Sequence, residues 1–265
     1  MDVVPRWRAV VVTALAICGA VCMRSWSGHL PAALWLPTGF LLAAALLVHH
    51  RHVGSLLLVR AVLWSNLLLG TVVCWYGGSS DRHVAPILAL ANGAALLLLG
   101  RRGLDGGAQN GRFVPMAFRG ALVAILVMAL ADAQTLLFFG SLYFQLSGVD
   151  LRLVVPPLLI AGAFLGSVAG LYRLRVWGLA LDAVASLGLL AFATTDLLRL
   201  GPMFNIVFAG SAIFQLVLVA SVVVRLARGA APAPSRLSRA SVWLGMLAVA
   251  ALMASAIVPV VHQYW

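Results

Sequence analysis

The chain has 265 residues, of which 63% are hydrophobic and 9% are charged, and its mean hydropathy is +1.06. This composition is typical of a polytopic membrane protein and excludes an ordinary soluble domain. The charged residues are 18 basic and 7 acidic side chains. Because the sequence contains no Lys, a retinal-type Schiff base is also excluded.

Nine apolar stretches follow one another along the chain. A helix needs about 20 mostly apolar residues to cross a bilayer, and lipid offers no partners for an open backbone. We therefore predict an all-α, polytopic transmembrane helical bundle of about nine helices, or eight if one stretch does not span. We expect the first stretch to be a retained helix, and residues 1–265 to form a single integral-membrane domain. The predicted spans are Ala9–Met23, Leu30–Val48, Gly54–Tyr76, Val84–Gly100, Met116–Gly140, Leu153–Tyr172, Val176–Leu198, Met203–Val224 and Ser241–Val261.

The arginines predict an orientation for these spans. If the N-terminus is cytoplasmic, fourteen of the 18 arginines fall in cytoplasmic segments or at their edges. Retention of basic residues on that side is the usual pattern, so we predict a bacterial cytoplasmic (inner) membrane protein with an outside C-terminus. The net charge of +11 then favours anionic lipid headgroups as partners. It does not indicate nucleic-acid binding, because no basic soluble module is present.

Three residues with charged side chains lie deep within the predicted spans, away from the span ends, where charges are costly and often functional. Arg60 and Asp182 lie at similar predicted depths, and an ion pair between them would let both be tolerated. The alternative is that Arg60 reaches the headgroups while Asp182 meets water or another arginine. Asp132 lies in the outer third of its span without a matching cation. It is therefore either neutral or faces a water-filled cleft.

The sequence indicates no catalytic site, and we predict that the protein is not an enzyme. Asp132 and Asp182 lack the flanking patterns of an intramembrane aspartyl protease, and their predicted depths differ. The six histidines show no helical ligand spacing, so no metal site and no haem is predicted. No cofactor is expected.

Several residues of the first half occur in a distinctive order. A helix start with Trp-x-Pro-x-Gly is followed by an Asn in the next span and by a second Asn in the span after it. That third span ends in paired arginines. These marks are Trp35, Pro37, Gly39, Asn66, Asn92, Arg101 and Arg102.

This order and spacing resembles the first type of bacterial membrane-associated sensor domain. That family is the multi-helix input module of certain histidine kinases and diguanylate cyclases. The resemblance covers residues 30–120, while residues 121–265 diverge from the family. The chain departs from the family at Ala95, where an acidic residue is expected, and no kinase or cyclase domain is recognisable in these 265 residues.

The same residues have a physical interpretation. Pro37 is expected to loosen its helix and Gly39 to permit close helix contact. Asn66 and Asn92 can form hydrogen bonds between helices, worth about 0.6–2 kcal/mol each. Such bonds serve either a ligand-responsive switch or ordinary helix association.

The resemblance implies a stand-alone sensor-type module of the membrane. It would relay a small-molecule, lipid or partner signal to a separate signalling protein. One alternative is a small proton-coupled transporter or channel that uses Asp132. Another is a structural subunit of a membrane complex, and the sequence also leaves a homo-oligomer open.

Overall fold

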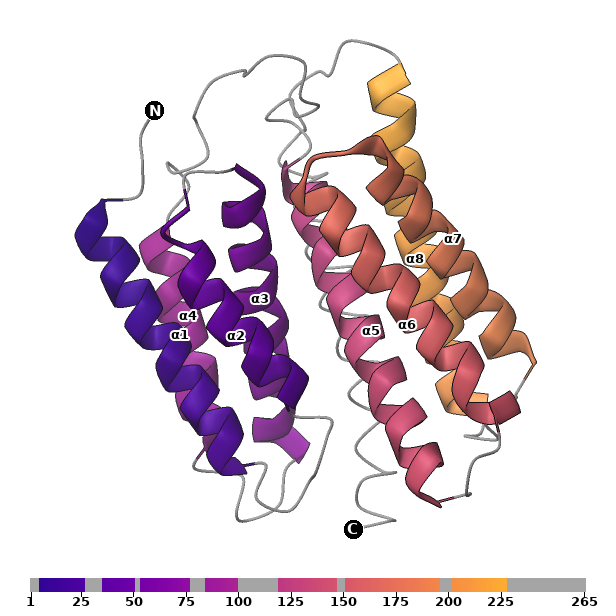
Figure 1. Ribbon diagram of the computed structural model, residues 1–265, viewed down its shortest axis with the longest axis horizontal. Coiled ribbons are helices and arrows are strands. Elements are labelled where there is room, and N and C mark those ends of the chain that lie inside the picture. The colour runs from indigo at the N-terminus through magenta and orange to yellow at the C-terminus, as the bar shows by residue number, and fades with distance from the viewer. Residues whose placement is uncertain are drawn as a thin grey trace. The chain divides into compact units, whose positions relative to one another are not determined.

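The computed structural model describes residues 5–26, 35–50, 53–76, 84–99, 119–146, 151–195 and 202–227. Within these ranges the elements are eight helices (Figure 1), which confirms the predicted all-α class. They are α1 (Arg6–Trp26), α2 (Trp35–Leu47), α3 (Val53–Tyr76), α4 (Val84–Leu99), α5 (Arg119–Leu146), α6 (Leu151–Tyr172), α7 (Val176–Thr194) and α8 (Pro202–Ala227). The ninth predicted span, Ser241–Val261, lies outside the described residues.

Four of these helices are long and apolar enough to cross a membrane. They are the last four, α5 to α8. Shorter apolar segments lie in α2, α3 and α4, whereas α1 belongs to neither group. The protein is therefore a multi-pass membrane helical protein. The four long segments are Gly120–Leu137, Leu153–Tyr172, Val176–Thr194 and Asn205–Ala227.

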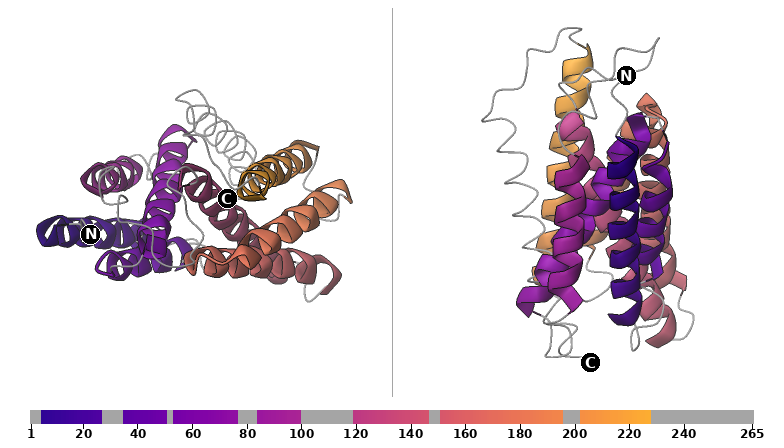
Figure 2. Two further views of the ribbon diagram at one scale, coloured as in Figure 1. Left: turned by 90° about the horizontal axis from the view of Figure 1, so that it is seen from above. Right: turned by 90° about the vertical axis from the view of Figure 1, so that its left-hand side faces the viewer.

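The helices divide into two compact units. The first, Met1–Met116, contains α1 to α4, and the second, Ala117–Trp265, contains α5 to α8. In the first unit α1 packs against α2 and α4, and α3 packs against the same two helices. The second unit repeats this ring, with α5 and α7 each packed against α6 and α8 (Figures 1 and 2). The boundary lies close to residue 120, where the sensor-like part was predicted to end. Whether the two units act as a single domain stays a prediction.

Helices α6 and α7 form a tight hairpin in the second unit. The amides of Leu174 and Arg175 donate to the carbonyls of Leu171 (2.9 Å) and Gly170 (3.0 Å), the hydrogen-bond pattern of a Schellman helix end. Leu174 has φ = 54°, the left-handed conformation that such an end requires. The chain then reverses at once into α7. A Cβ placed on Gly170 would lie 2.7 Å from the Cα of Gly178, so the two backbones touch there.

Helix α5 is the most buried of the long segments. Every side chain from Leu122 to Leu130 is buried, so this stretch meets protein on every face. The helix also continues past the predicted end of its span at Gly140 and reaches Leu146. Asp132 is therefore the fourteenth of its 28 residues and lies at the middle of the helix. Within the apolar segment Gly120–Leu137, however, Asp132 falls in the last third, and its predicted place in the outer third of the span stays a prediction. Polar residues such as Ser141 end the apolar run without ending the helix.

Candidate functional site

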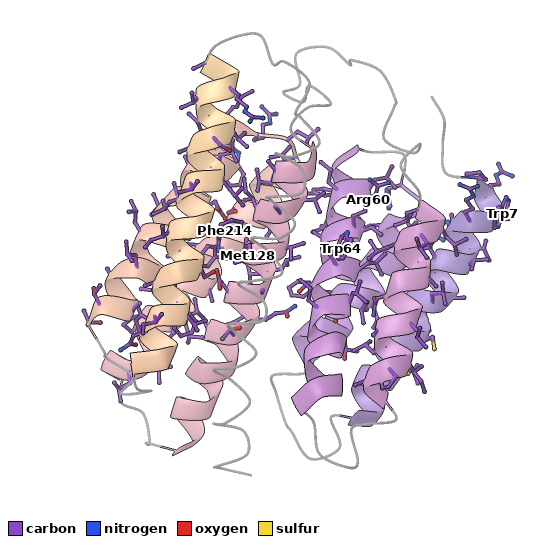
Figure 3. The ribbon with its side chains drawn as sticks, turned by 180° about the vertical axis from the view of Figure 1, so that it is seen from behind. Trp7, Arg60, Trp64, Met128 and Phe214 are labelled. Atoms are coloured by element: carbon purple, nitrogen blue, oxygen red, sulfur yellow. The ribbon has the colours of Figure 1, made fainter. Side chains whose placement is uncertain are left out.

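The centre of the second unit contains a buried carboxyl held by α5 and α8. Asp132 projects from α5 and has no exposed surface. Its Oδ2 accepts a hydrogen bond from the Ser211 hydroxyl (2.7 Å) and another from Nε2 of Gln215. Ser211 and Gln215 are one helical turn apart on α8, so their side chains reach the same neighbour. In Figure 3, the labelled Met128 and Phe214 mark this part of α5 and α8.

A second buried carboxyl lies between α6 and α7. Asp182 of α7 also has no exposed surface, and its Oδ1 accepts a hydrogen bond from the Ser167 hydroxyl (3.0 Å). The tight hairpin explains this contact, because Ser167 and Asp182 lie beside the close approach of the two helices. One turn further along α7 lies the fully buried Ser186. Its hydroxyl has no hydrogen-bond partner among the described residues.

The two carboxyls are close enough for Asp132 to interact electrostatically with Asp182. We treat the six fully buried polar side chains of α5, α6, α7 and α8 as one candidate site. These side chains are Asp132, Ser167, Asp182, Ser186, Ser211 and Gln215.

The basic side chains of the second unit that the structure describes are all exposed. In the described part of the second unit, Arg173, Arg175 and Arg225 are exposed and lie at helix ends, and neither carboxyl pairs with any of them. An unpaired charge in a low-dielectric interior is costly, so the cluster is suited to holding a proton or another small cation. No group of three or more His, Cys, Asp or Glu side chains that could hold a metal ion occurs among the described residues.

Arg60 takes a place that the sequence did not predict. It is a half-buried residue of α3, in the first unit, and its Nη2 donates to the carbonyl of Leu99 (3.4 Å). Leu99 is the last residue of α4, where backbone carbonyls lack partners within the helix and a cation is favourable. Arg60 and Trp64 mark this part of α3 in Figure 3. Because Asp182 belongs to the other unit, their pairing stays a prediction.

The two asparagines of the sensor-like part are both buried. Asn66 Nδ2 donates to the carbonyl of Val62 (2.9 Å), and Asn92 Nδ2 donates to the carbonyl of Leu88 (2.7 Å). Both acceptors are one turn earlier in the same helix, so among the described residues these amide groups form hydrogen bonds within their own helices and not, as predicted, between helices. The Oδ1 atoms of Asn66 and Asn92 are buried and have no hydrogen-bond partner among the described residues.

The other sensor-like residues lie at the start of α2. Trp35 and Pro37 belong to its first turn, where a helix has free N–H groups anyway. Proline is tolerated there, and the expected loosening of the helix by Pro37 stays a prediction. Gly39 is exposed, and a Cβ placed on it would meet nothing within 4 Å among the described residues. It therefore makes no close helix contact with that part of the chain.

The sequence interpretation missed the neutral members of the buried cluster. Ser211 and Gln215 on α8, and Asp182 and Ser186 on α7, form two pairs with a spacing of four residues. Such a pair places two polar groups on one face of an otherwise apolar helix, and this pattern is readable from the sequence. The sequence around Ser167 shows no such pair, because the residues that stand out near it are the glycines Gly166 and Gly170.

No known protein family, no curated protein and no solved structure matches the chain.

Proposed function

We propose that this protein is a small proton-coupled transporter or channel, and that Asp132 is the carboxyl that takes up and releases the proton. The observation that carries the proposal is the buried cluster of α5 to α8, with two carboxyls that interact and no basic side chain bonded to them among the described residues. Carboxyls inside membrane helices commonly mark proton relays.

The chemistry of the cluster argues against a purely structural role. Helices associate in membranes through small residues and neutral polar side chains, and both are present here. A second carboxyl near the first adds nothing to such packing, since two acidic groups without a cation are costly to bury. The same pair is useful if one carboxyl can pass a proton toward the other. Ser167 and Ser211 can follow this change, because a hydroxyl both donates and accepts hydrogen bonds.

Proton flux into vesicles tests the proposal. The purified protein is reconstituted into liposomes that contain a pH-sensitive dye, and a potassium gradient with valinomycin drives protons inward. Acidification should exceed that of empty liposomes and should be lost in Asp132→Asn, which preserves the shape of the side chain. Thr135→Ser is the matched control on α5, since Thr135 donates only to the carbonyl of Ala131 in its own helix (2.8 Å). Flux that equals the empty-liposome rate, or that survives Asp132→Asn, would refute the proposal.

A second candidate function is the sensor-type module that the first half resembles. The observation that favours it is that the buried Oδ1 atoms of Asn66 and Asn92 have no partner among the residues the structure describes. Each can accept a hydrogen bond from a ligand or a rearranged helix. In this role the first unit would relay a small-molecule, lipid or partner signal to a separate signalling protein. Cross-linking in native membranes should then recover a kinase, a cyclase or a regulator. Recovery of lipid and this chain alone would count against the sensor.

A further inference from the structure

Two oxygens beside the Asp132–Gln215 hydrogen bond have no partner in the described part of the chain. Nε2 of Gln215 donates to Oδ2 of Asp132, and Ser211 donates to the same oxygen. The other oxygens of the two bonded groups, Asp132 Oδ1 and Gln215 Oε1, are buried and have no hydrogen-bond partner among the described residues. An ionised carboxylate and an amide carbonyl can only accept hydrogen bonds. With Asp132 ionised, both oxygens would therefore lack a donor.

We propose that Asp132 carries a proton on Oδ1 and donates it to Oε1 of Gln215, which closes a cyclic acid–amide pair. A single proton then satisfies both orphaned oxygens, while Nε2 continues to donate to Oδ2. Two parallel hydrogen bonds between planar groups also fix their mutual orientation, as they do in other bidentate pairs. Gln215 thereby becomes the positioning residue that makes Asp132 a binding site for a proton.

Among the described side chains, none supplies a cation that bonds to Asp132. Helix α5 packs against α6 and α8. Among the described side chains of the second unit, the charged groups other than the two aspartates are the exposed arginines at helix ends. Asp182 is acidic and adds repulsion when both carboxyls are ionised. Protonation of Asp132 therefore removes a buried charge, removes this repulsion and completes the hydrogen bonding of Gln215 at once.

The geometry also predicts how substitutions behave. Asp132→Asn replaces the acid by an amide, which can donate to Oε1 and accept from Nε2 without any added proton. The bonded pair survives, but the site can no longer take up or release a proton. Gln215→Leu keeps the carboxyl but removes the acceptor of its proton and one donor to Oδ2. Asp132→Asn therefore tests the role of the proton, and Gln215→Leu tests the role of the group that accepts its hydrogen bond.

Infrared spectroscopy of the purified full-length protein in detergent at neutral pH tests the pair directly. A protonated carboxyl has a carbonyl stretching band apart from those of carboxylates and amides. We expect this band in the wild type, its loss in Asp132→Asn, and a shift to higher frequency in Gln215→Leu, because a weaker hydrogen bond stiffens the carbonyl. Asp182→Asn is the control, and it should leave the Asp132 band in place. If Gln215→Leu does not fold, Gln215→Asn, with a side chain too short to close the pair, provides the same comparison.

The inference is overturned if Asp132→Asn removes no band, or if the band keeps its frequency when Gln215 is replaced. It concerns the carboxyl on which the proposed function rests, but the spectrum requires no transport. A band that is lost in Asp132→Asn, together with liposomes that show no proton flux, would support the acid–amide pair and refute the transporter. Proton flux that depends on Asp132, in a protein without the band, would refute the acid–amide pair and support the transporter.

Discussion

The closest approach of two helices in the second unit yields a prediction with a definite sign. A Cβ on Gly170 would lie 2.7 Å from the Cα of Gly178 and 2.8 Å from Cζ3 of Trp177. Carbon atoms in contact are normally about 3.5–4.0 Å apart. In Gly170→Ala, α6 and α7 must therefore separate by about 1 Å, because one of the clashing atoms is backbone and cannot turn aside.

The loss of stability expected for Gly170→Ala combines the cost of overpacking with the gain in helix propensity. Extra methyl groups in well-packed interiors cost about 1–3 kcal/mol, and a backbone clash belongs at the upper end. Replacing Gly by Ala inside a helix stabilises the helix by about 1 kcal/mol, because Ala has the higher helix propensity. The net loss expected for Gly170→Ala is about 2 kcal/mol, and the strain would extend to the Ser167–Asp182 hydrogen bond one turn away.

Gly162→Ala, two turns earlier on α6, is the matched control. Gly162 is exposed, and a Cβ placed there would meet nothing within 4 Å among the described residues. Its expected effect is a gain of about 0.5–1 kcal/mol. Unfolding by SDS titration in mixed micelles, followed by tryptophan fluorescence, measures both variants. If Gly170→Ala proves as stable as Gly162→Ala, the two backbones do not touch at Gly170 and the expected clash must be given up.

Three further substitutions are predicted for the same unfolding assay. Ser167→Ala removes the donor to Asp182 and should destabilise the protein by about 1–3 kcal/mol, and an unchanged midpoint would contradict that hydrogen bond. Asn92→Leu removes a buried oxygen that has no partner among the described residues, so it should cost less than about 1 kcal/mol; a larger loss would reveal a partner. Gly39→Ala, at an exposed helical position, should stabilise by about 0.5–1 kcal/mol, and a measured loss would indicate a helix contact there.

The apolar runs were sufficient to predict the helices, because a membrane span must bury its own backbone hydrogen bonds whatever its neighbours are. Each of the first eight predicted spans overlaps one of the helices α1 to α8. Helix ends were less predictable. A few polar residues end an apolar run in the sequence without ending the helix, and α5 continues to Leu146.

The candidate site was predictable only in its charged members. Because a carboxyl inside a membrane is costly, Asp132 and Asp182 stand out within their apolar spans. Their partners depended on tertiary packing. Ser211 is 79 residues from Asp132 along the chain, and a neutral serine or glutamine in a span has many harmless explanations. Pro37 and Gly39 show the converse, because both residue types can disturb a helix. Pro37 lies in the first turn of α2, where proline is tolerated, and Gly39 is exposed.

The α6–α7 hairpin has a mechanical consequence for the second unit. Its short turn and touching backbones leave these two helices little freedom to slide past each other, so we expect them to behave as one rigid pair. Of the helix pairs that pack extensively in the described part of this unit, α5 and α8 share the smallest contact. The hydrogen bonds of Asp132 cross that seam. A proton gained or lost at Asp132 would therefore act on the least extensive helix contact of this ring.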